Sequence, residues 1–274
     1  MSVTVDVQIT RCGFCRARAW FVDRSSFFRI IRFPAMIALI RHPRLGTILF
    51  DAGYGRALAL SRDARFYRRL LDFELPESER IPARLSQLGV SQIQLIFLSH
   101  FHPDHIGGLR EVPGDAPILH SRRGLSRLRS LRGMKRQRSA FFADLLPDDL
   151  QQRAHAIEDL PASPIGDPFE EGRDVGGDGA LIAVPLPGHA AGQYGLLCRL
   201  RNNRRILLCA DAAWLRSNIT EHPRPTWAAR MVADDPKALK RTLADLYEFS
   251  LHYPDVEIIP SHCEESIAAY ARQT

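Results

Sequence analysis

The sequence lacks the long apolar runs that a membrane-spanning helix requires. Such a helix needs about 20 consecutive apolar residues, whereas the best candidates here, Pro34–Ile40 and Ala180–Leu186, are only as long as a strand. The first residues also lack a basic start followed by an apolar stretch, so we expect no secretory signal. These absences argue against a membrane partner and favour a cytoplasmic protein.

Cysteine is scarce as well, with five residues in a chain of 274. An odd number in a chain of this length is not typical of a disulfide framework, so a reduced compartment is expected. Cys12 and Cys15 form a C-x-x-C pair. A zinc or redox role would need two further ligands nearby or a thioredoxin-like context, and neither is visible. We interpret the pair as unremarkable thiols near a strand end.

Lysine is nearly absent, since all of the 37 basic residues except Lys135, Lys237 and Lys240 are arginines. With 31 acidic residues the net charge is +6, which permits an anionic partner without requiring one. Eight of the basic residues lie between Arg122 and Arg138. They indicate either an anion or nucleic-acid surface or a solvated helix face. We favour the solvated face, because no aromatic residue is interleaved with the arginines.

Short apolar segments alternate with helical patterns along the chain. The segments that predict strands are Val3–Ile9, Met36–Ile40, Thr47–Phe50, Ile93–Leu98, Ala180–Leu186, Tyr194–Leu200, Arg205–Cys209 and Val256–Ile259. The segments that predict helices are Ile81–Leu88, residues 121–146 and Pro236–Tyr253. Asp235 can cap the last helix, and Leu239, Leu243, Leu246 and Phe249 form its apolar stripe. Leu125, Leu128, Leu131 and Met134 are expected on one side of the segment 121–146. Residues 159–179, rich in proline, glycine and acids, predict a surface loop.

This order of elements predicts an α/β or α+β layered fold, with helices covering two sheets or one large sheet. We expect one domain over residues 1–274, with a helical insert at about 121–158.

Potential metal ligands gather directly after the apolar strand Ile93–Leu98. His100 and His102 are two residues apart, so both imidazoles point the same way on an extended segment. Asp104 and His105 follow where the chain turns toward a helix, and Gly107 and Gly108 allow a close approach of the backbone. Imidazole and carboxylate donors together suit Zn²⁺, and also Mn²⁺ or Fe²⁺.

Three more candidate ligands lie at the ends of later strands. His189 follows the strand Ala180–Leu186, Asp211 follows Arg205–Cys209, and His262 follows Val256–Ile259. A sheet delivers side chains at strand ends to a shared rim, so these residues can complete a metal site.

The motif His-x-His-x-Asp-His at 100–105 resembles the signature of the metallo-β-lactamase superfamily. His189, Asp211 and His262 match the later ligands of that family in order, and Asp51 matches an acidic residue found after an early strand. The resemblance spans residues 3 to 270 and implies a four-layer αβ/βα sandwich. It implies that His100, His102 and His189 hold one metal ion, that Asp104, His105 and His262 hold the other, and that Asp211 bridges them.

The resemblance also implies a mechanism, in which a hydroxide held between two divalent ions attacks the substrate. Asp104 would orient this nucleophile and protonate the leaving group. Asp51 would hold a ligand imidazole by its ring N–H. A binding protein that keeps the fold without activity is disfavoured, because seven buried polar side chains destabilise a protein that lacks metal.

Within this family the spacing of motifs is most similar to the N-acyl homoserine lactone lactonases. The stretch Asp23–Ser26 resembles their N-terminal loop, and Phe27 and Phe28, like Phe33, Phe141 and Phe142, are candidates for an apolar substrate pocket. One departure is Trp214, which stands where those enzymes often carry a tyrosine three residues after the bridging aspartate.

The expected partner is a small-molecule lactone or ester, and a glyoxalase-II-like thioesterase is the alternative. A nucleic-acid-processing hydrolase ranks lower, because the chain lacks room for a large inserted domain. Exposed loops and aromatic segments would allow a homodimer.

Overall fold

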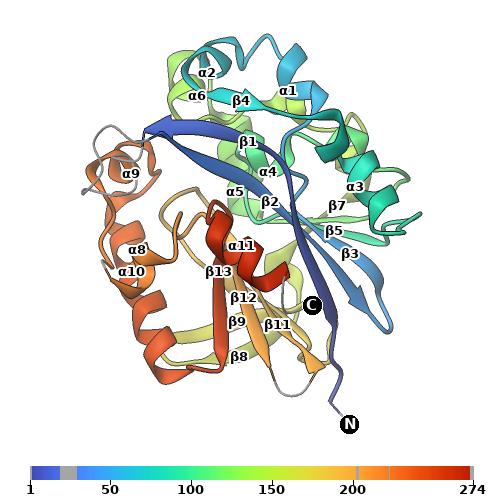
Figure 1. Cartoon of the computed structure of the whole chain (residues 1–274), viewed down its shortest axis with the longest axis vertical. Coiled ribbons are helices and arrows are strands. Elements are labelled where there is room, and N and C mark those ends of the chain that lie inside the picture. Colours follow the sequence, from blue (N-terminus) through green and yellow to red (C-terminus); the bar gives the residue numbers. More distant parts are fainter. Residues whose placement is uncertain (1, 19–29, 202–203, 222, 272–274) are drawn as a thin grey trace.

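Two mixed β-sheets pack face to face in the computed structural model, which describes residues 2–18, 30–201, 204–221 and 223–271 (Figure 1). The first sheet has the strand order β4-β1-β2-β3-β5-β6-β7, and the second has the order β13-β12-β11-β10-β9-β8. Of the two arrangements that the sequence predicts, the structure therefore has two sheets and not one large sheet.

The first sheet consists of β1 (Asp6–Arg18), β2 (Ile30–His42), β3 (Gly46–Phe50), β4 (Asp72–Glu74), β5 (Leu95–Phe97), β6 (Ile118–His120) and β7 (Ala154–Ala156). The second consists of β8 (Ala162–Gly166), β9 (Phe169–Asp174), β10 (Leu181–Pro185), β11 (Tyr194–Arg199), β12 (Arg205–Ala210) and β13 (Val256–Pro260). The α-helices are α1 (Arg56–Leu60), α2 (Arg65–Leu70), α3 (Ile81–Gln87), α4 (Pro103–Ile106), α5 (Arg122–Ser130), α6 (Gly133–Arg138), α7 (Leu150–Arg153), α8 (Ser217–Thr220), α9 (Trp227–Val232), α10 (Pro236–His252) and α11 (Glu264–Ala271). Short 3-10 turns lie at Glu77–Glu79, Leu109–Glu111, Ala143–Leu145 and Ile157–Asp159.

The central strands of both sheets bury both of their faces, which explains why they appear as continuous apolar runs. Successive side chains of a strand point to opposite faces, and in β2 Ile37 and Leu39 pack under the outer helices while Ala38 and Ile40 face the second sheet. In β12, Leu207 in the same way faces outward and Leu208 faces the first sheet. The space between the sheets is thus the central core.

Helices cover the outer face of each sheet. Leu58 of α1, Leu85 of α3 and Leu128 of α5 belong to the core outside the first sheet, and Leu246 and Phe249 of α10 belong to the core outside the second. The result is the expected four-layer αβ/βα sandwich. Among the described residues, no helix is long and apolar enough to cross a membrane.

Helix α10 supports the loop that carries His189. Asp235 caps the helix as expected, because its Oδ1 accepts hydrogen bonds from the N–H groups of Lys237 and Ala238, both at 3.0 Å. Its own N–H donates to the carbonyl of Gly188 at 2.9 Å. A Cβ at Gly188, where φ is +132°, would lie 2.1 Å from the backbone nitrogen of Leu239, so only glycine permits this contact.

Two sequence expectations about loops and strands are wrong. Residues 159–179 do not form a simple loop, since β8 and β9 pair there as an antiparallel hairpin. The proline and glycine residues mark the turn of this hairpin. The local sequence does not show, however, which segment an edge strand pairs with. The first strand is also longer than Val3–Ile9, because β1 continues to Arg18 along β2.

Two further expectations about single residues need correction. Cys12 and Cys15 do not lie near a strand end but are buried within β1, where the register shifts between Arg11 and Phe14. Met134 does not continue the buried leucine stripe of α5 and is 72% exposed. The chain breaks between α5 and α6, which rotates Met134 away from Leu125, Leu128 and Leu131.

The cap of α10 predicts a measurable stability effect. Asp235→Ala leaves the first N–H groups of the helix without an acceptor and should lower the free energy of unfolding by about 1 kcal/mol. Asp235→Asn keeps an acceptor oxygen and should retain most of the stability. Urea unfolding of both variants measures the difference, and equal losses in the two would contradict the capping role.

Candidate metal centre

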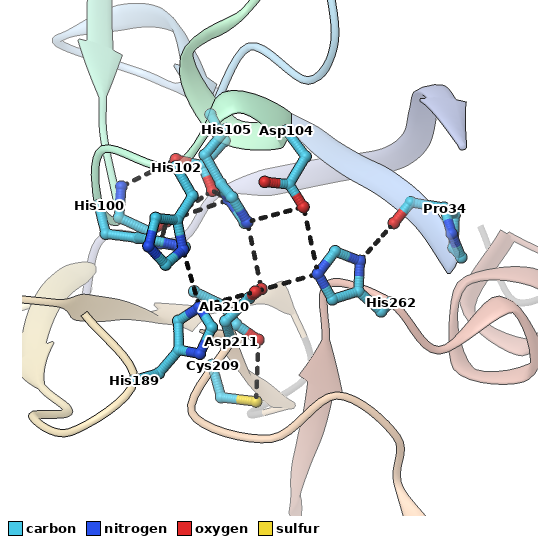
Figure 2. A network of polar contacts seen from close by, with 12 residues as sticks. Pro34, His100, His102, Asp104, His105, His189, Cys209, Ala210, Asp211 and His262 are labelled. Atoms are coloured by element: carbon cyan, nitrogen blue, oxygen red, sulfur yellow. Dashed lines mark hydrogen bonds and ion pairs between the residues drawn. The ribbon is translucent and has the colours of Figure 1, made fainter. Parts of the chain in front are cut away.

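The candidate ligands all lie at strand ends along one edge of the sandwich. His100 and His102 follow β5, and Asp104 and His105 lie in the short helix α4 that comes next. His189 follows β10. Asp211 and His262 follow β12 and β13, which are parallel neighbours, so their side chains emerge side by side (Figure 2). Segments far apart in the sequence therefore meet in one place.

The first cluster consists of His100, His102, His189 and Asp211, all buried. His100 Nε2 lies 3.0 Å from His102 Nδ1, which lies 2.9 Å from His189 Nε2. His189 Nε2 lies 3.2 Å from Asp211 Oδ2. Each side chain thus directs one donor atom to a common point.

The second cluster consists of Asp104, His105, His262 and, again, Asp211. His105 Nε2 lies 3.1 Å from Asp211 Oδ1, and His262 Nε2 lies 3.0 Å from Asp211 Oδ2 (Figure 2). Asp104 Oδ2 lies 3.3 Å from His262 Nε2. The Asp211 carboxylate is therefore common to both clusters, which is the grouping that the family resemblance implies.

Groups behind the clusters hold the imidazole rings in orientation. His105 Nδ1 donates to Asp51 Oδ2 at 2.7 Å, and His262 Nδ1 donates to the carbonyl of Pro34 at 2.8 Å. Asp51 also accepts from the backbone N–H and the hydroxyl of Ser99, at 2.8 and 2.7 Å. These bonds turn the Nε2 atoms of His105 and His262 toward the centre.

Sequence reasoning found Asp51 but missed Ser99 and Pro34. Ser99 directly precedes the histidine motif, which is a local signal that could have identified it. Pro34 contributes only a backbone carbonyl from β2, 228 residues away from His262 in the chain, so no residue type could have marked it.

Burial and neighbouring charges shift the protonation of the centre. Burial lowers the pKa of His100 and His102 well below the usual value, and the adjacent imidazoles lower it further. Burial alone would raise the pKa of Asp211, but the charges of His262 and His105 hold it well below its usual value. His100 and His102 are therefore neutral with free lone pairs, and Asp211 is a carboxylate, which are the forms that bind metal ions.

The two clusters fit a pair of divalent metal ions. Among the described residues, His105 Nε2 and Asp211 Oδ1 are buried without a hydrogen-bond partner although they face each other. Buried polar atoms in that state are costly unless something else satisfies them. Tetrahedral ligands at about 2.0–2.1 Å from zinc lie about 3.3 Å apart, close to the spacings of the imidazole nitrogens here. The donor set of imidazoles and carboxylates suits zinc, and also manganese or iron.

Aromatic side chains surround the two clusters. Trp214 packs edge to face with His189, with ring centroids 6.0 Å apart, and Phe33 packs in the same manner with His262 at 5.9 Å. Phe141 lies against His102 at 5.1 Å. Phe142 is a core residue that contacts Tyr67, and Phe27, Phe28 and the stretch Asp23–Ser26 lie outside the described residues.

A cavity opens beside the first cluster. His189, Asp211 and Trp214 form one wall, and side chains of α9 and α10, among them Ala229 and Leu243, form the other. The wall opposite the candidate ligands is thus largely apolar, which suits the hydrocarbon part of a small molecule.

Comparison with known proteins extends these observations. The sequence pattern of the Metallo-beta-lactamase superfamily matches residues 31–262. The chain is 26% identical over 237 residues to the N-acyl homoserine lactonase AttM of Rhizobium radiobacter, covering 81% of this chain and 82% of that protein. It is 27% identical over 259 residues to the probable metallo-hydrolase Rv2300c of Mycobacterium tuberculosis, covering 87% and 79%.

The fold is also similar to a solved structure. A single-residue mutant of AiiA from B. thuringiensis, with N-decanoyl-L-homoserine bound at its active site, superimposes with a TM-score of 0.74. The match covers 98% of this chain and 97% of AiiA at 18% sequence identity. At that identity the similarity supports the fold of this chain and not its substrate.

Metal analysis of purified variants tests the two clusters. We expect His102→Ala to lose metal because one of three convergent imidazoles is missing, and Asp211→Asn to lose metal from both clusters because the shared negative charge is missing. His155→Ala is the matched control, since His155 is exposed and far from the candidate ligands in sequence. Elemental analysis that finds wild-type metal content in His102→Ala would contradict the assignment.

Proposed function

Because this chain belongs to the metallo-beta-lactamase superfamily and carries a binuclear His/Asp site, we propose that it hydrolyses a lactone or another carboxylic ester of a small molecule. The observation that carries the proposal is the pair of buried clusters that share Asp211. N-acyl homoserine lactones are the first candidate substrates, since AttM, which aligns with 81% of the chain, bears the name of that activity.

We assign His100, His102 and His189 to one metal ion, Asp104, His105 and His262 to the other, and Asp211 to both. Zinc is the first candidate, and manganese or iron are the alternatives. A bound pair of divalent ions would lower the pKa of water in the site toward about 7 and polarise the substrate carbonyl. The shared Asp211 carboxylate offsets the repulsion between two dications, and Asp51 keeps the His105 ring turned toward them.

Asp104 is the candidate for proton transfer in this reaction. Its Oδ2 lies 3.3 Å from His262 Nε2 and 3.8 Å from His105 Nε2, and its side chain is 11% exposed, so it can contact a substrate at the surface of the site. When the ester bond breaks, the leaving alkoxide oxygen needs a proton. In our proposal Asp104 orients the attacking water, accepts the proton that this water loses on Oδ2, and then donates that proton to the leaving oxygen.

Trp214 is the candidate for contact with the substrate carbonyl. It lines the cavity, and no hydrogen bond of its indole N–H to another described residue exists in the structure. The lactonases that this sequence resembles often carry a tyrosine there. An indole N–H can donate a hydrogen bond but has no proton to lose at ordinary pH. This position therefore bears on which lactone or ester the enzyme accepts.

A side-by-side substrate panel tests the proposal. Metal-loaded protein should hydrolyse acyl-homoserine lactones or simple lactones, followed by proton release, and His102→Ala should abolish this activity while His155→Ala keeps it. Acyl-glutathione thioesters serve as the third arm, for the thioesterase alternative. Turnover of the thioesters alone, or of nothing by a fully metal-loaded protein, would contradict the lactonase proposal.

Substitution of Trp214 tests its role separately. Trp214→Phe keeps an aromatic wall but removes the N–H, and should reduce kcat/KM for the preferred ester about fivefold, which corresponds to about 1 kcal/mol for one neutral hydrogen bond. Trp214→Tyr supplies a hydroxyl instead and should restore the activity. Metal content should be unchanged in both variants. Wild-type kcat/KM in Trp214→Phe would show that the N–H is not used.

The homodimer and the cytoplasmic location that the sequence suggests stay predictions. Size-exclusion chromatography with light scattering measures the first directly.

A further inference from the structure

Two arginine-rich segments that are distant in sequence meet on one side of the molecule. Residues 56–70 contain α1 and α2, and residues 129–138 contain the end of α5 and all of α6. Asp63 links them, since its carboxylate pairs with Arg136 and its carbonyl accepts from Gln137. Ser61 also donates to Asp144, just beyond α6, at 2.8 Å. We call these two segments the basic cap; its helices α1, α2 and α6 lie together at the top of Figure 1.

The basic cap holds the positive surplus of the protein. The two segments contain ten basic side chains and one carboxylate, a net charge of +9, whereas the whole chain carries only +6. The remainder of the chain is therefore net negative. An unequal distribution of this kind creates a local positive potential that overall charge conceals.

Seven of the cations are exposed and have no acidic partner among the described residues: Arg62, Arg65, Arg69, Arg129, Arg132, Lys135 and Arg138. In this they differ from Arg122 and Arg127 of α5, which pair with Asp159 and Asp234. Helical geometry places four of the free cations outward. Tyr67 faces inward against Phe142, so Arg65 and Arg69 point to the opposite side of α2. Arg136 and Gln137 face Asp63, so Lys135 and Arg138 point away from it.

Large apolar side chains are exposed among these cations. Leu60 is 80% exposed, Phe66 55% and Met134 72%. All three lie on the helices of the basic cap, and a surface that exposes several large apolar side chains is typical of one that meets a partner. The combination of exposed cations with protruding apolar side chains is typical of protein surfaces that bind the interface of an anionic lipid bilayer.

The sequence predicts no membrane partner because it lacks a spanning segment, but surface docking needs no such segment. We propose that the basic cap is a docking surface for anionic lipid bilayers. The free cations would bind lipid phosphates, and Leu60, Phe66 and Met134 would enter the boundary of the acyl chains. A nucleic acid would use the same cations, but its bases need aromatic partners for stacking, and two of the three exposed apolar residues are aliphatic. This inference does not depend on the proposed function, because none of these residues contacts the candidate metal centre.

Docking through the basic cap would orient the candidate site toward the bilayer. Phe141 comes three residues after the end of α6 and packs on His102, while Tyr67 of α2 packs on the neighbouring Phe142. The cap and the site therefore share one wall. A substrate with a hydrocarbon chain could then pass from the lipid surface to the aromatic surroundings of the clusters.

Vesicle flotation with the metal-loaded full chain tests the proposal. We expect the wild type to bind vesicles of equimolar phosphatidylcholine and phosphatidylglycerol, with affinity that falls as salt rises, and not to bind phosphatidylcholine alone. Each cation near an anionic surface contributes about a factor of five. The triple variant R65Q/R69Q/K135Q should therefore bind about a hundredfold more weakly.

The matched control K237Q/K240Q/R241Q removes the same charge from exposed positions of α10 and should bind almost as the wild type does. Phe66→Ser with Met134→Ser keeps every charge and should still bind more weakly, since the apolar contribution is lost. Metal content and esterase activity in detergent-free buffer should be equal in all of these proteins. A failure of the docking proposal can therefore be distinguished from a failure of the proposed function.

Several outcomes would overturn the docking proposal. These are absence of wild-type binding to the anionic vesicles, equal binding to phosphatidylcholine alone, or an equal loss in the α10 control. Cap-dependent binding of a single-stranded oligouridine by a protein that ignores vesicles would identify a nucleic acid as the partner instead.

Discussion

The Asp211 carboxylate is the contact on which the arrangement of the whole site depends. It lies within 3.2 Å of ring nitrogens from His105, His189 and His262, which come from three separate segments of the chain. Burial of so many polar side chains would be strongly unfavourable without a compensating negative charge. One shared carboxylate supplies that charge to both clusters, so the two halves of the site cannot be formed independently.

The sandwich supports this contact through backbone geometry. Parallel pairing of β12 and β13 brings Asp211 and His262 to the same edge, and Ala210 adopts a left-handed conformation, with φ of +50°, just before Asp211. Gly108 packs so closely that an added Cβ would lie 2.2 Å from the carbonyl of Ala52, which confirms the close approach expected there. The motif glycines thus join the helix α4 to the loop that carries Asp51.

Charge has two different roles in this molecule. At the candidate metal centre, charges are buried, few and paired, and they set which groups are protonated. On the basic cap, most charges are exposed and lack an acidic partner among the described residues, and they act over the distance of a Debye length. The net charge of the sequence is a sum over the candidate metal centre, the basic cap and the rest of the chain, so it reveals neither of these two roles. Only the spatial separation of α1, α2 and α6 from the acidic remainder distinguishes them.

The sequence by itself determined which residues form the two candidate metal clusters, because these residues follow apolar strands and four of them belong to one short, recognisable motif. It also determined most strands and the cap of α10, since these depend on local patterns. The tertiary structure alone decided the β8–β9 hairpin, the Pro34 carbonyl behind His262 and the meeting of two arginine segments around Asp63. The contacts of Pro34 and Asp63 join residues distant in the chain through a backbone carbonyl or a polar side chain. The strands β8 and β9 are close in sequence, but most of their side chains are exposed or half-buried. None of these contacts therefore leaves an apolar periodic signal in the sequence.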